Sequence, residues 1–269
     1  MRNKGLLATS KEAHLRFLTR ARKLVDQSGI SAPPIDPLHL AALQGIRRVI
    51  ISGSVAVSGQ LIRDCGDLVV VLNAREPVER QNFSCCHEIA HTFALDAPTP
   101  KFRDLSSVLA CSALSLEEKL CDRAAAEMLM PEKFFRPLAN GLEPSISSVV
   151  ELSRRFRTSV SATLLRIGRL GVWPVLFIAW RFFPRIGSTP KLRVVWSVRP
   201  EGTRCFVPRH AGADPSSGIY ATFATACPTL EHENLNLGSL RGKFLVESAR
   251  FGDYVVSLVH NPGLRRGVR

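Results

Sequence analysis

The sequence predicts an α+β protein, in which a mostly helical N-terminal part with a small sheet precedes a β-rich C-terminal part. Three observations support this prediction. Apolar residues recur at helical spacing through much of residues 9–170, glycine-separated β-branched runs fill residues 46–72, and strand-like runs dominate after Gly171. The 269 residues are 45% hydrophobic, which is ordinary for a chain that buries a core in one large domain or two small ones. We expect three parts: residues 1–145, a helical segment at 146–171 and a β-rich region at 172–269.

Glycine and proline mark the ends of the expected elements in the first part. Gly29 ends the first helix, and Asp36 followed by Pro37 is typical of an N-cap and a first helical residue. The expected elements are a helix over 9–28, a short helix from 37 to 45, strands over 49–51, 55–57 and 68–72, a helix over 77–94 and a helix over 115–130.

Two more helical patterns, joined by Arg157-Thr158-Ser159, precede the β-rich region. They cover residues 146–156 and 160–170. The strands expected after them cover 173–183, 191–198, 218–223, 242–247 and 254–259.

The cysteine content and the apolar runs indicate the cellular compartment in which the protein is expected. The 7 cysteines show no spacing typical of a disulfide framework or a zinc ribbon, which favours free thiols in a reducing compartment. Residues 1–10 lack the apolar stretch of a secretory signal. The most apolar run, 170–180, is shorter than the roughly 20 residues that a spanning helix needs. We therefore expect a cytoplasmic protein without a membrane segment.

The net charge of +13 is unevenly distributed. Residues 151–200 contain ten lysines and arginines but a single acid, Glu151. Such a block is compatible with an acidic partner such as nucleic acid. A solvated basic face is the more economical interpretation, and we prefer it slightly.

The sequence His87-Glu88-Ile89-Ala90-His91 is the most specific motif of the chain. Residues i and i+4 lie on one face of a helix, so His87 and His91 can bind one metal ion. Glu88 lies beside this pair, where it can take a proton from a water. This is the H-E-x-x-H arrangement of zinc peptidases, with the glutamate as general base.

A catalytic zinc site needs a third protein ligand, and the helix expected over 115–130 offers Glu118. Asp122, one turn later, can accept the N–H of a ligating histidine and fix its tautomer. In the alternative interpretation, Ser115 is an N-cap and Glu118 belongs to its capping box. The histidines upstream and Asp122 downstream favour Glu118 as the ligand.

Other residues are weaker candidates for metal binding. Cys86 and Cys121 have suitable chemistry but fit core-facing positions, and Asp96 and Asp104 lie in an expected loop. The remaining histidines are isolated in the sequence: His14, His39, His210, His232 and His260.

These motifs resemble those of the ImmA/IrrE-type zinc metallopeptidases over roughly residues 15–170. The departures are mild: Asp122 and Ala124 replace the common Asn and Phe, and Ile89-Ala90 replaces Leu-Gly. The segments that carry the resemblance are 29–36, 80–84, 87–91, 118–122 and 125–131.

The resemblance implies a zincin-like helical core with a small sheet, zinc bound by His87, His91 and Glu118, and a helix-turn-helix-like segment within 146–170. Family members typically cleave or relieve a DNA-bound repressor in stress responses or mobile-element regulation. A protein substrate, such as a helix-turn-helix repressor, is therefore expected. If strand 68–72 is an exposed edge, an extended substrate could pair with it, although its apolar run favours a core strand.

Two competing functions remain open at this point. The chain could be a DNA-binding transcriptional regulator, with Ser161, Thr163 and Arg166 as candidate base contacts, or a sensor with a non-proteolytic zinc site. An additional donor to the oxyanion is left unassigned among four candidates: Tyr220, Tyr254, His210 and His232.

Overall fold

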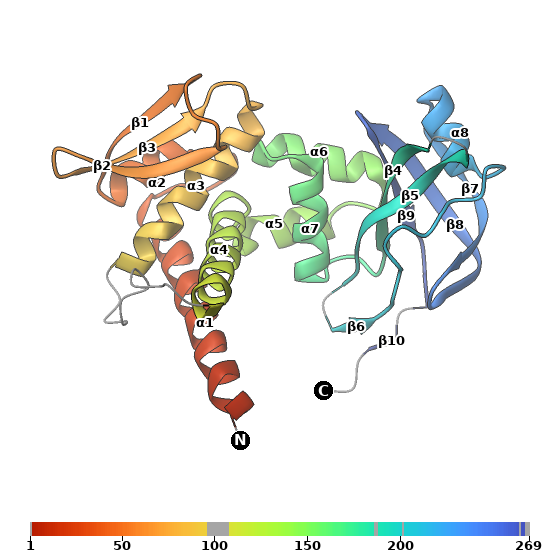
Figure 1. The fold of residues 1–269 in the computed structure, drawn as a ribbon, viewed down its shortest axis with the longest axis horizontal. Helices are drawn as coiled ribbons and strands as arrows, with labels where there is room; N and C mark the ends of the chain where they lie inside the picture. Colours follow the sequence, from red (N-terminus) through yellow and green to blue (C-terminus); the bar gives the residue numbers. More distant parts are fainter. Residues whose placement is uncertain (1, 96–107, 186–187, 201, 264, 267–269) are drawn as a thin grey trace. The chain divides into compact units, whose positions relative to one another are not determined.

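The computed structural model of the chain describes residues 2–95, 108–185, 188–200, 202–263 and 265–266. Its helices and strands form a mixed α+β fold, as predicted (Figure 1). The chain divides into two compact units. The first unit comprises Met1–Phe135 and Ser153–Ser159, and the second comprises Arg136–Leu152 and Val160–Arg269.

The first unit holds four helices, a three-stranded sheet and parts of two further helices. Helices α5 and α6 each cross the division between the units. In chain order the elements are α1 (Arg2–Gln27), α2 (Pro37–Leu43), β1 (Ile46–Ser52), β2 (Gly59–Asp64), β3 (Asp67–Asn73), α3 (Val78–Leu95), α4 (Val108–Leu129), α5 (Glu132–Asn140) and α6 (Ile146–Phe156).

Strand β3 lies at the centre of the small sheet, with β1 parallel to it on one side and β2 antiparallel on the other. Strand 68–72 is therefore a central strand, as its apolar run indicated, and the alternative of an exposed edge at these residues is wrong. The expected strand over 55–57 is also wrong, because β2 begins at Gly59. Cys65 and Gly66 take positive φ angles of 50° and 96° and form a tight two-residue turn between β2 and β3. Because of this turn, the residues directly before it, 59–64, pair with β3.

Helices α3 and α4 pack against each other, and α1 packs against α4. The helix expected from residue 115 begins earlier, at Val108. Ser115 therefore lies inside a helix and cannot be its N-cap, so the capping-box interpretation of Glu118 is wrong. The predicted short helix is confirmed in detail, since the Asp36 side chain accepts the N–H of Leu38 and Pro37 follows as the first helical residue.

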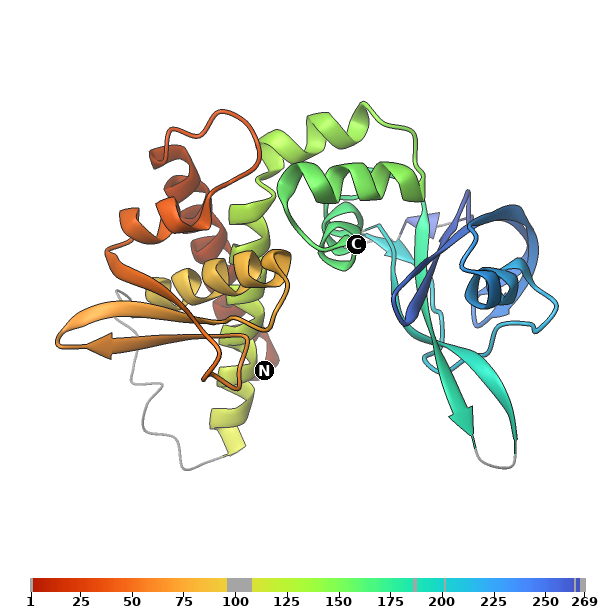
Figure 2. The same ribbon diagram turned by 90° about the horizontal axis from the view of Figure 1, so that it is seen from above.

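The second unit is built on a five-stranded antiparallel sheet with the order β5-β4-β9-β8-β7. Figure 2 shows β4 and β5 as a long twisted hairpin. The further elements are α7 (Val160–Leu170), β4 (Leu176–Arg185), β5 (Ser188–Val198), β6 (Thr203–Arg204), α8 (Gly218–Thr225), β7 (Thr229–Leu237), β8 (Leu240–Phe251), β9 (Tyr254–Val259) and β10 (Arg265–Arg266).

Helix α8 covers one face of this sheet and corrects one prediction. The strand expected over 218–223 is wrong, because these residues form α8, which packs against β7, β8 and β9. The Ser217 side chain caps the helix by accepting the N–H of Tyr220. The periodicity of a short apolar run does not show whether it forms a strand or a helix. Here the cap residue Ser217 favours the helix. Trp180, with 0% exposure, lies in the core cluster to which the α8 residue Ile219 also belongs.

Within the described ranges, no helix combines the length and the apolar character that crossing a membrane would require.

Candidate metal centre

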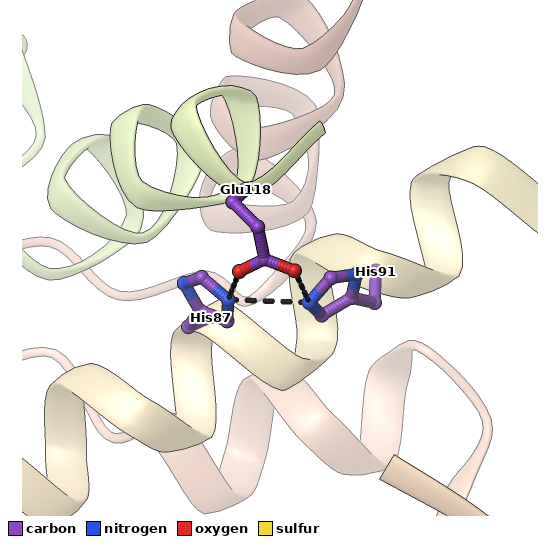
Figure 3. A group of neighbouring side chains, drawn as sticks. All are labelled: His87, His91 and Glu118. Atoms are coloured by element: carbon purple, nitrogen blue, oxygen red, sulfur yellow. Dashed lines mark hydrogen bonds and ion pairs between the residues drawn. The ribbon is translucent and has the colours of Figure 1, made fainter. Parts of the chain in front are cut away.

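Helices α3 and α4 bring the three predicted ligands together (Figure 3). One turn of α3 separates His87 from His91, and their Nε2 atoms lie 3.1 Å apart. From α4, the Glu118 carboxylate lies 3.1 Å from His87 Nε2 and 3.6 Å from His91 Nε2. The three donor groups come from two packed helices, so their geometry depends on the α3–α4 contact.

Each histidine also has a carboxylate on its other ring nitrogen. Asp122 Oδ1 lies 3.0 Å from His87 Nδ1, as the sequence suggested, and Glu117 Oε1 lies 3.1 Å from His91 Nδ1. An ionised carboxylate can only accept hydrogen bonds, so both Nδ1 atoms are donors. In the neutral rings, both Nε2 atoms then carry lone pairs that face each other and the Glu118 carboxylate. A proton on one of the rings, or a cation bound between the three groups, would offset the repulsion between them.

The donor set fits zinc. Two imidazole nitrogens and one carboxylate are a standard set for a catalytic zinc ion, with zinc–ligand distances of about 2.0–2.2 Å. Tetrahedral ligands at that distance lie about 3.3 Å from one another. The observed separations of 3.1, 3.1 and 3.6 Å agree with this spacing. The residues present can therefore hold zinc without a rearrangement of the two helices.

Glu88 lies beside the two histidines on α3 and is 8% exposed. Its Oε2 accepts the backbone N–H of Leu61 from β2 at 2.9 Å. Gly59 at the start of β2 permits this approach, since a Cβ there would lie 3.1 Å from Ser84 Cβ and 3.4 Å from Glu88 Cγ. Strand β2 thus fixes the orientation of the Glu88 carboxylate.

Burial raises the pKa of Glu88 above its ordinary value. The neighbouring His91 and His87 and the Leu61 N–H oppose this shift, whereas the Glu118 carboxylate adds to it. A raised pKa brings a carboxylate closer to the working pH, which is what a general base needs.

Burial lowers the pKa of His91, but the hydrogen bond with Glu117 and the surrounding carboxylates outweigh burial and raise it overall. The carboxylates around His91 therefore favour a positive charge at this ring, either as a proton or as a bound cation.

The weaker metal-ligand candidates differ in their positions. Cys86 and Cys121 are buried, and burial raises the pKa of both thiols, which disfavours the thiolate that metals bind. Cys121 Sγ lies 3.6 Å from His91 Nδ1, on the side of the ring away from Glu118. Asp96 and Asp104 lie outside the described residues.

The isolated histidines of the first unit, His14 and His39, do not join this group. His14 contacts Arg123, and the His39 ring lies 3.3 Å from the Ser28 carbonyl. The candidate oxyanion donors Tyr220, Tyr254, His210 and His232, together with His260, belong to the second unit. The Tyr220 hydroxyl accepts the N–H of Leu192 there.

Two of the three candidate DNA contacts on α7 are inaccessible. Thr163 and Arg166 are buried, and only Ser161 is exposed. Arg157, between α6 and α7, takes a positive φ of 51° without being glycine. This backbone conformation permits a tight turn between the two helices, but the burial of Thr163 and Arg166 contradicts their proposed role.

Sequence reasoning missed Glu117 and the contribution of β2. Glu117 directly precedes Glu118, and the sequence motifs give it no role. Its spacing of four residues from Cys121, a predicted core position, is a signal that Glu117 faces the neighbouring helix. No comparable signal was available for Leu61, because its position follows from the pairing of β2 with β3.

Comparison with known proteins adds independent findings. Residues 46–167 match the family model described as the IrrE N-terminal-like domain, peptidase family M78. The radiation response metalloproteases IrrE of Deinococcus radiodurans and Deinococcus deserti are each 29% identical over 110 residues, or 40% of this chain. These alignments cover only 33% and 39% of the two relatives' own lengths.

A solved structure, of a Mycobacterium tuberculosis transcriptional regulator, has a similar fold. Its TM-score is 0.57 at 16% sequence identity, and the match covers 93% of this chain and 81% of that chain. At this identity the likeness concerns the fold alone.

Proposed function

We propose that this chain, which belongs to the ImmA/IrrE family through its IrrE N-terminal-like domain at residues 46–167, is a zinc-dependent endopeptidase that hydrolyses a protein substrate. The family and the IrrE relatives support metallopeptidase activity in general terms. The finer statements about zinc and the catalytic roles rest on the geometry of the site, and the proposed substrate rests on the family resemblance.

One observation carries the proposal. The Nε2 atoms of His87 and His91 and the Glu118 carboxylate converge within 4.8 Å of one another, while Asp122 and Glu117 face the opposite ring nitrogens. A zinc ion bound between the three groups would offset the repulsion between their electron pairs, and this convergence is the main support for the proposal.

Glu88 is the proposed general base. Its carboxylate takes a proton from the attacking water and later returns it to the leaving amine nitrogen. The Leu61 N–H holds Oε2, so Oε1 is the oxygen that exchanges the proton. A zinc ion held by His87, His91 and Glu118 would supply a Lewis acid for the scissile carbonyl and lower the pKa of the attacking water towards ~7.

Strand β2 is the proposed position for an extended substrate, in place of β3. It forms one edge of the small sheet, and its Leu61 N–H points to Glu88 instead of to β3. Backbone groups alternate along a strand, so Gly59 and Arg63 face the same free side. A peptide paired there would lie next to Glu88.

The proposed substrate is a transcriptional repressor, such as a helix-turn-helix protein, in a stress-response or mobile-element system. The stress-response part is supported by the radiation response of the two named relatives. We place the activity in the cytoplasm.

The test compares the unsubstituted chain with Glu88→Gln and with Glu79→Gln, which removes the same charge from the first turn of α3. Each protein is loaded with zinc and incubated with a peptide library, and new termini are counted by mass spectrometry. We expect Glu88→Gln to retain one zinc ion per chain and its fold, and to cleave about 10²–10⁴-fold more slowly. Glu79→Gln should cleave at the wild-type rate.

Equal cleavage by Glu88→Gln and the wild type would contradict the general-base role. A wild-type chain that holds zinc but produces no new termini would favour the non-proteolytic sensor.

A further inference from the structure

A row of four side chains crosses the C-terminal sheet on one face. Arg193 on β5 pairs with Arg181 on β4, which pairs with Tyr254 on β9, which in turn pairs with Phe251 on β8. Directly paired residues of antiparallel strands project from the same face. The row therefore presents two guanidinium groups next to two aromatic rings.

This row projects from the sheet face opposite the core cluster that contains Trp180 and Ile219. The neighbouring pair, Leu192 and Phe182, belongs to or packs against the core cluster that includes the α8 residue Ile219. Side chains alternate along a strand, so Arg193 and Arg181 point away from α8. Arg181 is exposed and Tyr254 is 38% exposed, which leaves both accessible on this face.

The two arginines are an unfavourable pair in the absence of a ligand. Like charges directly opposite each other on neighbouring strands destabilise a sheet. Within the described part of the chain, neither Arg181 nor Arg193 forms an ion pair with an acid. The adjacent pair in the same face, Ala179 and Val256, adds no negative charge. An anion between the two guanidinium groups would relieve this repulsion.

Their local contacts leave the guanidinium groups able to bind such an anion. Arg193 donates from one Nη atom to the His210 carbonyl at 2.8 Å, which orients its side chain. Arg181 lies with its Cζ atom 5.7 Å from the centre of the Tyr254 ring. Both contacts leave other N–H groups of the planar fork for phosphate oxygens.

The aromatic half of the row favours a ligand with flat rings. Tyr254 and Phe251 continue the row directly from Arg181. Phe183, 36% exposed, lies on the same face of β4 and packs edge-on against His210, with the ring centres 6.2 Å apart. Single-stranded nucleic acids bind to basic grooves in which aromatic side chains stack on bases.

We propose that this face binds single-stranded nucleic acid, with phosphates at Arg181 and Arg193 and a base on Tyr254. The second unit as a whole suits a polyanion, because residues 136–152 and 160–269 contain 16 Lys and Arg against 8 Asp and Glu, a net +8. The proposal is independent of peptidase activity and gives the basic C-terminal region a role of its own.

The test uses the full-length chain and a fluorescein-labelled, mixed-sequence 12-nucleotide DNA strand, with anisotropy measured at several salt concentrations. R181A/R193A is compared with R47A/R75A, which removes two exposed arginines from the first unit and so matches the net charge. Loss of two phosphate contacts should reduce the slope of log K against log salt by about 1 to 1.5. The control variant should keep the wild-type slope.

The stacking role is tested at Tyr254 with two substitutions. Tyr254→Phe keeps the ring and should bind within about two-fold of the wild type, whereas Tyr254→Leu should weaken binding roughly five-fold or more. Circular dichroism checks that each variant keeps its fold.

Three results would overturn the proposal. The wild type could fail to bind the strand at micromolar protein, or R181A/R193A could lose no more affinity than R47A/R75A. Tighter binding to the matching duplex, with Tyr254→Leu unchanged, would indicate backbone contact with double-stranded DNA instead.

Discussion

The two units of the chain present their polar groups in opposite ways. In the first unit, histidines and carboxylates from α3 and α4 converge, and each has a specific partner within 3.1 Å. In the second unit, exposed Arg181 and half-buried Arg193 lie side by side on one sheet face, with a like charge as the neighbour. The first arrangement fits a small cation, and the second fits an extended anion.

The two sites also differ in how their residues are distributed along the sequence. Most groups of the metal centre lie within two short segments, 87–91 and 117–122, where helical spacing alone sets which residues share a face. The arginine–aromatic row draws one residue from each of four strands, so only the register of the whole sheet defines it. The first kind of site can be found from a sequence, whereas the second needs the structure.

The sharpest test of the metal centre removes its third donor. Glu118→Ala leaves two histidines, which no longer complete a three-ligand site, so zinc content should fall from about one ion per chain to near zero. Metal is measured by mass spectrometry after purification without added zinc. Lys119→Ala, an exposed change on the next residue, serves as the control. Undiminished zinc in Glu118→Ala would assign the third ligand elsewhere.

A core substitution tests whether the two units depend on each other. Trp180 is fully buried, and its Nε1–H donates to Ser257 Oγ at 2.9 Å. Trp180→Ala should destabilise the second unit by about 3–5 kcal/mol, measured by urea unfolding followed by circular dichroism. Zinc content should not change, because every donor lies in the first unit.

Leu230→Ala provides the control for that experiment. Leu230 lies on β7 of the same sheet and is 63% exposed, so its truncation should have little effect on stability. Loss of zinc in Trp180→Ala would mean that the two units are energetically coupled.

The next test concerns the carboxylates behind the histidines. Glu117→Ala removes the acceptor for His91 Nδ1 and leaves Cys121 Sγ at 3.6 Å as a poorer partner. Zinc affinity should fall about 10–100-fold, measured by competition with a chelating dye. Glu117→Gln retains an acceptor oxygen and should recover most of the affinity. Equal affinities for all three proteins would show that Glu117 does not position His91.

The fold was predictable where local signals were strong. The helices over 146–156 and 160–170 and the strand over 254–259 were placed at their observed ends, because their patterns are regular and their boundaries are marked. The strand over 55–57 and the strand over 218–223 were wrong for a shared reason. Both are short apolar runs whose secondary structure depends on nearby residues. The turn at Cys65 and Gly66 places the strand after 55–57, and the cap at Ser217 starts a helix at 218.

Two elements were missed because their signals conflict with simple patterns. Helix α5 contains Pro137, which normally interrupts a helix. The first half of strand β7 includes the exposed residues Leu230, Glu231 and His232, and only its second half alternates, with Glu233, Leu235 and Leu237 buried. In both cases the tertiary packing of the element outweighs its local sequence preference.

The smallest expected effect comes from Glu233 in β7. Burial raises its pKa above the ordinary value, and the carboxylates of Glu231 and Asp214 add to the shift, while the N–H groups of Ile219 and Gly218 oppose it. A raised folded-state pKa means that the fold favours the protonated form. The stability gained from this group is complete below the unfolded-state pKa and is lost as pH rises through the folded-state pKa.

Glu233→Gln removes this titration but keeps an acceptor for the Ile219 N–H. We therefore expect Glu233→Gln to be slightly more stable than the wild type near pH 7, by about 0.5 kcal/mol or less, with the advantage shrinking towards pH 4. The measurement is the urea midpoint at both pH values, with Glu143→Gln, an exposed site, as the matched charge control. A stability difference that does not depend on pH would mean that packing, and not the charge of Glu233, determines the effect of this substitution.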